Sequence, residues 1–322
     1  MLQYSYRRNA PPVGQKRSGA DQSWMDYSPI ITRPPIRWPG GARIALWICP
    51  CTLHFEFMPP ADPWIDSWAR TAPPDVLGYG RQEYGNRIGL WRLFEVLDTH
   101  KVRGTMVVNS ASLERYPAIA QAIAKRGWDI LGHGIVNTRF VFGLSEAEER
   151  DYYRGMRDKV EALTGIRMAG TGGPGPQAAT ESTIDILAEL GFRYHGDWFC
   201  DDQPVPLRVR SGQLIALPYA SEINDTGFLG MAFEAEDFVE ATMRQFDQLY
   251  AEGAENGRIL CITLHPHVFG QPQRIRYLDK LLSYFRSFPD VWHATGAEIA
   301  EYYYTNYYDA ALRHLEAERG GR

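Results

Sequence analysis

Short apolar runs alternate along the chain with segments in which apolar residues recur every three or four positions. The first run, RIALWI, covers residues 43–48, and a segment with an apolar helical face follows at residues 90–97. A second apolar run then covers residues 104–108. Short apolar runs are typical of buried strands, and the i, i+3, i+4, i+7 spacing is typical of an amphipathic helix. The pattern therefore predicts a strand-helix-strand unit.

The same alternation continues almost to the end of the chain. Further strands are predicted at residues 128–131, 192–194, 258–264 and 291–293, with helices that begin near Pro117 and Thr180 and helices over residues 239–250 and 278–285. Repeated strand-helix alternation favours parallel strands with helices outside them, either as a barrel or as a doubly wound sheet.

The two ends of the chain differ from this repeating middle. Residues 1–42 are polar and rich in Pro, Gly and Arg, so we expect an N-terminal arm before a barrel domain at 43–308. Residues 309–322 form a charged C-terminal tail or helix. The segment 57–86 is rich in Pro and aromatic residues and has no clear period, which favours a lid or a subunit contact. Together with a run of tyrosines at 302–308, this segment predicts a homo-oligomer.

Composition narrows the possible partners. Of the 322 residues, 44% are hydrophobic and 23% charged, which suits a chain with a sizeable core. A net charge of -5 without basic clusters favours a small-molecule substrate over nucleic acid. The sequence shows no apolar stretch typical of a signal peptide or a transmembrane helix, and its four cysteines are too few for a disulfide framework. We therefore expect a cytoplasmic protein with no membrane partner.

Histidines follow three of the predicted strands. His54 comes after the first strand, His133 after the strand at 128–131, and His265 after the strand at 258–264. The carboxyl ends of parallel barrel strands face one pocket, so we expect His133 and His265 to lie close together and to transfer protons. A structural hydrogen bond is the alternative for each, but the glycines that flank His133 favour a function. Pro266 separates His265 from His267, and we expect only His265 to face the pocket.

Two cysteines, Cys49 and Cys51, follow the first apolar run in a C-x-C pattern. This spacing has no partner pair typical of a zinc site or a redox site. Buried packing is the favoured role, and a nucleophilic cysteine near His133 or His265 is the alternative.

Four motifs together resemble the polysaccharide-deacetylase superfamily. They are G-H-G-x-x-N at 132–137, L-H-P-H at 264–267, R-I-R-Y-L-D-K-L-L-x-Y at 274–284 and V-W-H-A-T-G-x-E-I-A at 291–300. Within the superfamily the chain is similar, over about residues 43–304, to the branch of metal-independent allantoinases, cyclic-imide hydrolases and intracellular peptidoglycan-deacetylase-like proteins. The resemblance implies an α/β fold, a distorted (β/α) barrel of seven or eight parallel strands, assembled as a tetramer. It also implies hydrolysis of a carbon-nitrogen bond other than a peptide bond.

The resemblance also implies positions for the site. Metal-dependent members carry two aspartates after the first strand, an H-x-x-x-H motif and a late histidine. The corresponding positions here are Cys49 to Cys51, then His133 and Asn137, then His265. Asparagine is a poor zinc ligand and neither cysteine is a carboxylate, so we predict no cofactor. A zinc ion held by His133 and His265 is the alternative.

The predicted function is hydrolysis of a cyclic amide, ureide or imide by histidine acid-base chemistry. Its predicted catalytic residues are His133, His265 and Glu56, where Glu56 and His54 replace the missing carboxylate. The predicted substrate-binding residues are Asn137, His54, Cys51, Pro174, Trp198 and Asp202, and residues 222–225 are expected to help shape the pocket. Two alternatives stay open: a metal-dependent deacetylase of an N-acetylated carbohydrate, with Glu56 as a ligand, and a non-catalytic relative that keeps the pocket for binding.

Overall fold

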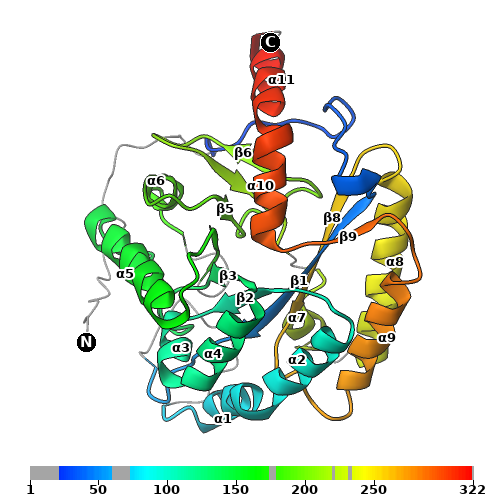
Figure 1. Cartoon of the computed structure of the whole chain (residues 1–322). Helices are drawn as coiled ribbons and strands as arrows, with labels where there is room; N and C mark the ends of the chain where they lie inside the picture. The colour runs from blue at the N-terminus through cyan, green and yellow to red at the C-terminus, as the bar shows by residue number, and fades with distance from the viewer. Residues whose placement is uncertain (1–21, 60–72, 174–178, 220–221, 231–233, 321–322) are drawn as a thin grey trace.

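The strands of the chain form one sheet that curls into a half-barrel (Figure 1). The structure is a computed structural model, and it describes residues 22–59, 73–173, 179–219, 222–230 and 234–320. Its strands are β1 (Ile44–Thr52), β2 (Thr105–Val108), β3 (Asp129–Gly132), β4 (Gly170–Thr171), β5 (Tyr194–His195), β6 (Val205–Leu207), β7 (Leu214–Ala216), β8 (Arg258–Leu264) and β9 (Val291–His293). Each strand predicted from an apolar run is present; β8 and β9 have the predicted bounds, and the others have shifted ends.

Neighbouring strands in the sheet follow the order β6-β7-β5-β4-β3-β2-β1-β8, and β9 also pairs with β1. All of these pairs are parallel except β6 with β7, which is an antiparallel hairpin. The longest register joins Ile44–Pro50 of β1 to Arg258–Leu264 of β8. A parallel bridge between Asn224 and Thr263 brings the chain after β7 against the free edge of β8. The expected distorted (β/α) barrel is confirmed, with the hairpin as an exception to its parallel strands.

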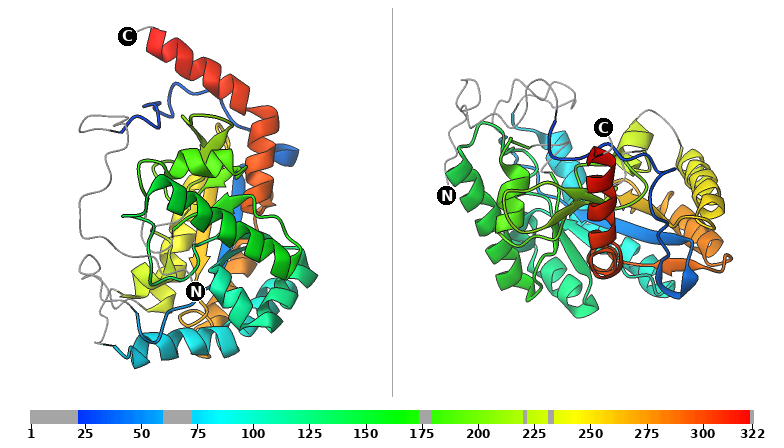
Figure 2. Two further views of the ribbon diagram at one scale, coloured as in Figure 1. Left: turned by 90° about the vertical axis from the view of Figure 1, so that its left-hand side faces the viewer. Right: turned by 90° about the horizontal axis from the view of Figure 1, so that it is seen from above.

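Helices surround the sheet on its outer side, except that residues 296–306 pack against the inner core at one end of the barrel and residues 308–320 extend away from it (Figures 1 and 2). They are α1 (Val76–Tyr84), α2 (Leu90–Thr99), α3 (Ser110–Arg115), α4 (Pro117–Arg126), α5 (Glu146–Thr164), α6 (Thr183–Glu189), α7 (Asp225–Gly230), α8 (Ala235–Glu252), α9 (Ile275–Phe285), α10 (Gly296–Asn306) and α11 (Tyr308–Gly320), with the short turns η1 (Pro39–Gly41) and η2 (Gly85–Gly89). Neighbouring parallel strands run in the same direction, so the chain must return along the sheet between them. The helices form these crossover connections.

Side chains of β1 alternate between two cores because successive residues of a strand point to opposite faces. Ile44, Leu46 and Ile48 pack into the core beneath the outer helices. The intervening side chains, which include those of Trp47, Cys49 and Cys51, pack inside the barrel. This parity places both cysteines on the inner face of β1.

Several elements were not predicted from the apolar pattern. α5 has a buried face, but its 19 residues carry so many charges that the face is hard to recognise in the sequence. Residues 76–89, inside the segment predicted as an irregular loop, are helical as α1 and η2. The helix predicted near Thr180 begins at Thr183, and the Thr180 hydroxyl instead donates to Glu149 at 2.5 Å.

The tyrosines of 302–308 pack mainly within the molecule. Tyr303 and Tyr308 are buried, and the Tyr304 hydroxyl donates to the carbonyl of Arg193 at 2.8 Å. The Tyr307 hydroxyl accepts from the Arg37 amide at 2.8 Å. The prediction of exposed interface aromatics is therefore wrong for this run, because these rings join α10 to the barrel and to the N-terminal segment.

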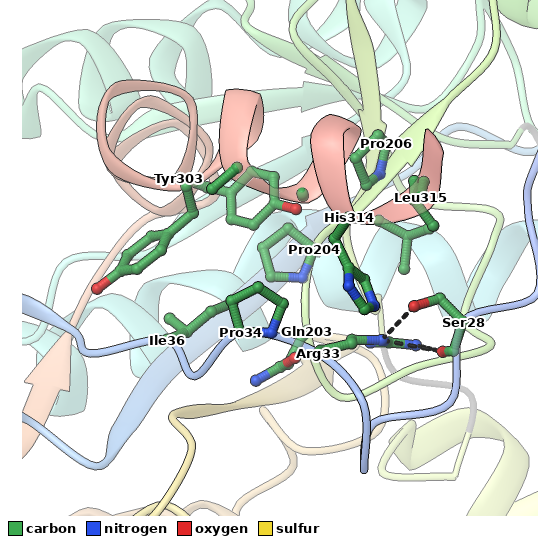
Figure 3. A pocket seen from close by; sticks show the side chains of 14 residues that line it. Ser28, Arg33, Pro34, Ile36, Gln203, Pro204, Pro206, Tyr303, His314 and Leu315 are labelled. Carbon is green, nitrogen blue, oxygen red and sulfur yellow. Dashed lines mark hydrogen bonds between the residues drawn. The ribbon is translucent and has the colours of Figure 1, made fainter. Parts of the chain in front are cut away.

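A small pocket of about 50 Å³ lies between α10, α11 and the segment before η1 (Figure 3). Its lining includes Arg33, Tyr303 and His314. α10 begins beside the first residues of β2 and β3, since the amides of Gly296 and Ala297 donate to Thr105 and Asp129 at 2.9 Å. The pocket therefore belongs to the amino-terminal side of the barrel, away from the strand ends that carry His133 and His265.

Candidate active site

Residues that follow β1, β2, β3, β5 and β8 meet at the carboxyl ends of the strands. Asn109, directly after β2, joins two of these ends: its Oδ1 accepts from the His54 amide at 2.8 Å, and its Nδ2 donates to the His133 carbonyl. The backbone amide of Asn137 donates to the backbone carbonyl of His54 at 2.9 Å. This network fixes the loops after β1 and β3 against each other.

His265 is held by Asp225, the first residue of α7. The Nδ1 of His265 lies 2.7 Å from Asp225 Oδ1, and the backbone amide of His265 donates to Asp225 Oδ2 at 2.8 Å. The Cys51 thiol also affects the imidazole electrostatically, and its own hydrogen bond goes to the Cys49 carbonyl at 3.8 Å. The ring orientation of His265 is thus set by a fully buried carboxylate.

These neighbours determine the charge of His265. Burial alone lowers its pKa, but Cys51 and Asp225 more than reverse this effect and raise the pKa to about 10. Burial also raises the pKa of Asp225, and the contacts with His265 and the Thr226 amide oppose that rise. We place the shared proton on His265 because backbone N–H groups donate to the Asp225 oxygens, which favours the carboxylate form.

His133 has the opposite electrostatic environment. Its imidazole lies against Gly173, where a Cβ would collide with the ring, and Gly173 has a φ of +70°. The pKa of His133 is lowered to about 4: burial is the largest cause and the charge of His265 adds to it, while Asp197 and the Gly172 backbone oppose the fall. The two imidazoles therefore interact, and at neutral pH one is cationic and the other neutral.

Asp197 comes two residues after β5 and supports the His133 side of the site. Its Oδ1 accepts from the Gly173 amide at 2.7 Å, and its Oδ2 lies 3.4 Å from Nε2 of His195. Burial raises the pKa of Asp197, but His195, Gly173 and His133 lower it overall. A carboxylate held in this way fixes the backbone at Gly173, and Gly173 in turn fixes the position of the His133 ring.

Polar atoms at these strand ends lack a partner among the described residues. They are Nδ1 of His133 and Oδ1 of Asn137, and Asn137 is 3% exposed. Buried polar atoms are usually paired, and unpaired ones are costly. They are the atoms that a polar substrate would satisfy.

Glu56 is engaged elsewhere. Arg139 donates to its two oxygens at 2.8 and 2.9 Å, and the Thr138 hydroxyl donates at 2.6 Å. Burial raises the pKa of Glu56, but these donors lower it overall. A carboxylate whose oxygens are occupied in this way is a weak proton acceptor, so the structure does not support Glu56 as the catalytic base. Its ion pair instead links the loops after β1 and β3.

The other predicted binding residues lie in different places. His54 is half-buried at the end of β1, and burial lowers its pKa. Trp198 packs edge-on against Trp24 at 5.8 Å between ring centroids, which is a structural contact. Asp202 lines a separate cavity of about 760 Å³ beside the inner face of β8. Pro174 lies outside the described residues.

A free backbone amide after β4 would be able to donate to a substrate carbonyl. The Gly172 amide donates to the Gly132 carbonyl at 2.9 Å, and the Gly173 amide donates to Asp197. Both amides are therefore already used within the protein.

The residues at the strand ends do not fit the metal site of the metal-dependent relatives. Across the described ranges, no group of three or more His, Cys, Asp or Glu side chains is arranged to hold a metal ion. Glu56 is paired with Arg139, and Asp225 contacts His265 rather than a shared centre.

The sequence analysis did not identify Asp197, and it included Asp225 only in a segment expected to help shape the pocket. Asp197 comes two residues after β5, so the strand-end rule that identified His133 also applies to it, but the sequence analysis favours the neighbouring Trp198. Asp225 lies 40 residues before its partner His265, and no local pattern distinguishes it from a solvated loop residue.

Comparison with known proteins finds similarity to polysaccharide deacetylases. Residues 83–195 match the family model for polysaccharide deacetylase. A Schizosaccharomyces pombe protein described as a candidate polysaccharide deacetylase is 27% identical over 242 residues, covering 68% of this chain and 73% of the yeast protein.

Two solved structures extend the likeness to most of the chain. A probable polysaccharide deacetylase from Pseudomonas aeruginosa PAO1 has a TM-score of 0.75 and 26% identity, covering 85% of this chain and 95% of its own. The structure of Puue allantoinase has a TM-score of 0.74 and 25% identity, covering 88% of this chain and 99% of its own.

No helix in the described part of this chain has the length and apolarity needed to cross a membrane.

Proposed function

Because this chain carries a polysaccharide deacetylase domain, we propose that it hydrolyses a carbon-nitrogen bond other than a peptide bond, in a cyclic amide, ureide or imide. The observation that carries the proposal is the opposite protonation of His133 and His265 at the same strand ends. Paired groups whose environments separate their pKa values are typical of an acid and a base that work together. The similarity to an allantoinase structure supports a small cyclic substrate.

Each histidine has a distinct role in this reaction. Neutral His133 accepts a proton from the water that attacks the carbonyl carbon, and cationic His265 donates a proton to the departing nitrogen. Asp225 keeps His265 charged and oriented, as the carboxylate of a catalytic triad does. No carboxylate base is needed, which accords with the engagement of Glu56 by Arg139.

The test is a turnover assay on a panel of cyclic imides, ureides and N-acetyl sugars with His133→Ala and His265→Ala. Each variant should lose about a hundredfold or more in kcat, because general acid-base catalysis contributes on that scale. Melting curves should stay close to the parent's, since neither imidazole contributes much apolar burial. His267→Ala is the matched control, because His267 follows the same strand without contacting Asp225, and it should keep most of the turnover.

Other results would change the function. Stoichiometric metal in protein purified without chelators, with loss of turnover on its removal, would favour the metal-dependent deacetylase. Absence of turnover across the panel, combined with a ligand-dependent rise in melting temperature, would favour a binding protein. Retained turnover in either histidine variant would remove that histidine from the mechanism.

A further inference from the structure

His195, the second residue of β5, is a fully buried histidine on the His133 side of the site. We propose that His195 is a positioning residue: it occupies the Asp197 carboxylate and holds residues 171–173, so that the His133 imidazole stays free to act on the substrate. The inference rests on the proposed hydrolytic function and adds a residue that acts without touching the substrate.

The two ring nitrogens of His195 have different partners. Nδ1 lies 2.9 Å from the backbone carbonyl of Thr171, the last residue of β4. A carbonyl oxygen only accepts hydrogen bonds, so Nδ1 carries a hydrogen atom and donates it to this bond. Nε2 faces the carboxylate of Asp197, at 3.4 Å from Oδ2. His195 thus joins the end of β4 to the acidic residue that follows β5.

The second of these contacts joins two atoms that are otherwise unpaired. Nε2 of His195 and Oδ2 of Asp197 are both buried and make no hydrogen bond in the described part of the chain. The other Asp197 oxygen accepts from the Gly173 amide at 2.7 Å. Unpaired buried polar atoms are costly, and the attraction between imidazole and carboxylate offsets this cost for both. The His195 ring and the Asp197 carboxylate therefore act as one unit.

This unit holds the short backbone segment beside the His133 ring. The Thr171 carbonyl at one end of the segment accepts from His195, and the Gly173 amide at the other end donates to Asp197. A Cβ on Gly173 would collide with the His133 ring, so backbone and imidazole are in close contact. A shift of residues 171–173 would displace the imidazole, and a misplacement of about 1 Å near reacting atoms can cost about a hundredfold in rate.

Two imidazoles, those of His195 and His133, lie near the same carboxylate. Burial is the largest cause that lowers the pKa of His133, and the charge of Asp197 opposes this fall. His195 is in ion-pair contact with Asp197 at 3.4 Å, whereas Nδ1 of His133 is unpaired among the described residues. A carboxylate that already has an imidazole partner attracts a proton to a second imidazole less strongly. His133 can therefore stay the neutral base that the proposed reaction needs.

Other titratable groups face these residues from α5 and from the loop after β8. Burial raises the pKa of Glu149, and hydrogen bonds from two threonines and the charge of His195 oppose the rise. Burial and the charges of Glu149 and Asp197 raise the pKa of Tyr153, which keeps its hydroxyl uncharged. The charge of His265 acts on His133. Asp197 is the group that acts on both His195 and His133, so a substitution of Asp197 should cancel the effect of a substitution of His195.

Histidine NMR on the resting protein tests the proposal without a substrate. The ring signal of His133, assigned by its loss in His133→Ala, should titrate at about pH 4 in the parent. In His195→Gln and His195→Phe its midpoint should rise by about one pH unit, because His133 is then the imidazole left to pair with Asp197. Gln keeps a polar N–H group and Phe keeps a planar ring, so the two variants perturb the buried position differently.

Two further variants serve as controls. Asp197→Asn keeps an oxygen that can accept from the Gly173 amide but removes the charge, so adding it to either His195 variant should cancel the rise in the midpoint. His100→Phe removes an imidazole that lies 2.7 Å from Asp279 of α9, and it should leave the midpoint unchanged. An unchanged midpoint in both His195 variants, or a rise that persists with Asp197→Asn, overturns the proposal.

Turnover separates the positioning role from the hydrolase itself. The lower pH limb of kcat/KM should move up in His195→Gln by the same amount as the NMR midpoint, and Asp197→Asn in the double variant should move it back. Turnover with an unchanged midpoint would remove His195 from the mechanism and leave the hydrolase standing. A shifted midpoint without turnover of any substrate would support the positioning of His133 and overturn the hydrolase instead.

Discussion

At the scale of single residues, the site depends on how neighbouring groups set the protonation of two histidines. His265 has a thiol and a carboxylate beside it, whereas His133 lies in a buried position against glycine backbone. The same side chain thereby serves as an acid in one place and as a base in the other. The division of roles therefore follows from the few groups that lie beside each imidazole.

The pH dependence of kcat/KM should reflect both histidines. Protonation of His133 removes the base as pH falls through about 4, and deprotonation of His265 removes the acid as pH rises through about 10. We therefore expect a broad plateau between these limits. Asp225→Asn should move the upper limb to lower pH, because Asp225 raises the pKa of His265. An upper limb that does not move in Asp225→Asn would contradict this account.

The same pKa of His265 predicts a contribution to folding stability. Its pKa is raised above the ordinary value of about 6.5, so the folded state binds the proton more tightly than the unfolded chain. This stabilisation is fully present below the unfolded pKa and is lost as pH rises through about 10. Urea unfolding at pH 6 and pH 10 should show a smaller stability difference in His265→Gln than in the parent.

At the scale of elements, α5 supports the loop that carries His133. The Ile135 amide, two residues after His133, donates to the Tyr152 hydroxyl of α5 at 2.8 Å. The adjacent Tyr153 hydroxyl is buried and has no partner among the described residues. The two neighbouring tyrosines therefore offer a matched pair of substitutions.

Tyr152→Phe should destabilise the fold by about 1 kcal/mol, because it leaves the Ile135 amide without its acceptor. It should also lower turnover, since the loop after β3 loses an anchor. Tyr153→Phe removes a hydroxyl that makes no hydrogen bond in the described structure, and it should be neutral or slightly stabilising. Urea denaturation of both variants measures the difference, and equal stabilities would show that the Ile135 hydrogen bond is not needed.

At the scale of the whole molecule, the surface that remains for self-association lies on α1 and the start of α2. Val76 and Leu77 are 64% and 51% exposed, and Ile88 and Trp91 are exposed beside them. Exposed apolar groups of this kind are typical of protein interfaces. The homo-oligomer predicted from the sequence stays a prediction, now with its interface on this surface rather than on the tyrosines of 302–308.

Sedimentation velocity at micromolar concentration tests this assembly. We expect an oligomer for the parent and a shift toward monomer for Leu77→Asp, because a charge at an apolar interface is costly to bury. Ile31→Asp is a control on the N-terminal segment, since Ile31 is also exposed, at 89% against 51% for Leu77, and the adjacent Thr32 hydroxyl donates to Glu318 of α11. A monomeric parent, or an unchanged assembly in Leu77→Asp, would contradict the prediction.

Much of the barrel was predictable because its strands are short apolar runs and its helices have one apolar face. β8 is the clearest case, since all of its residues are buried and its predicted bounds agree with the structure. β4, with two residues, and α5, with its many charges, carry too little apolar signal to be read reliably, and β5, predicted at 192–194, covers only Tyr194–His195. The alternation of buried and exposed positions is a property of the local sequence. Prediction from it fails where an element is very short or is buried only along a narrow stripe.

The sequence by itself determined that His133 and His265 follow strands of one parallel sheet, and the strand ends of such a sheet lie at one edge. Only the tertiary structure decided their partners. Asp225 contacts His265 although 40 residues separate them in the sequence, and strand parity turns the Cys51 side chain into the barrel. Protonation depends on burial and on charges a few ångströms away, and these distances exist only after the strands have closed around the site.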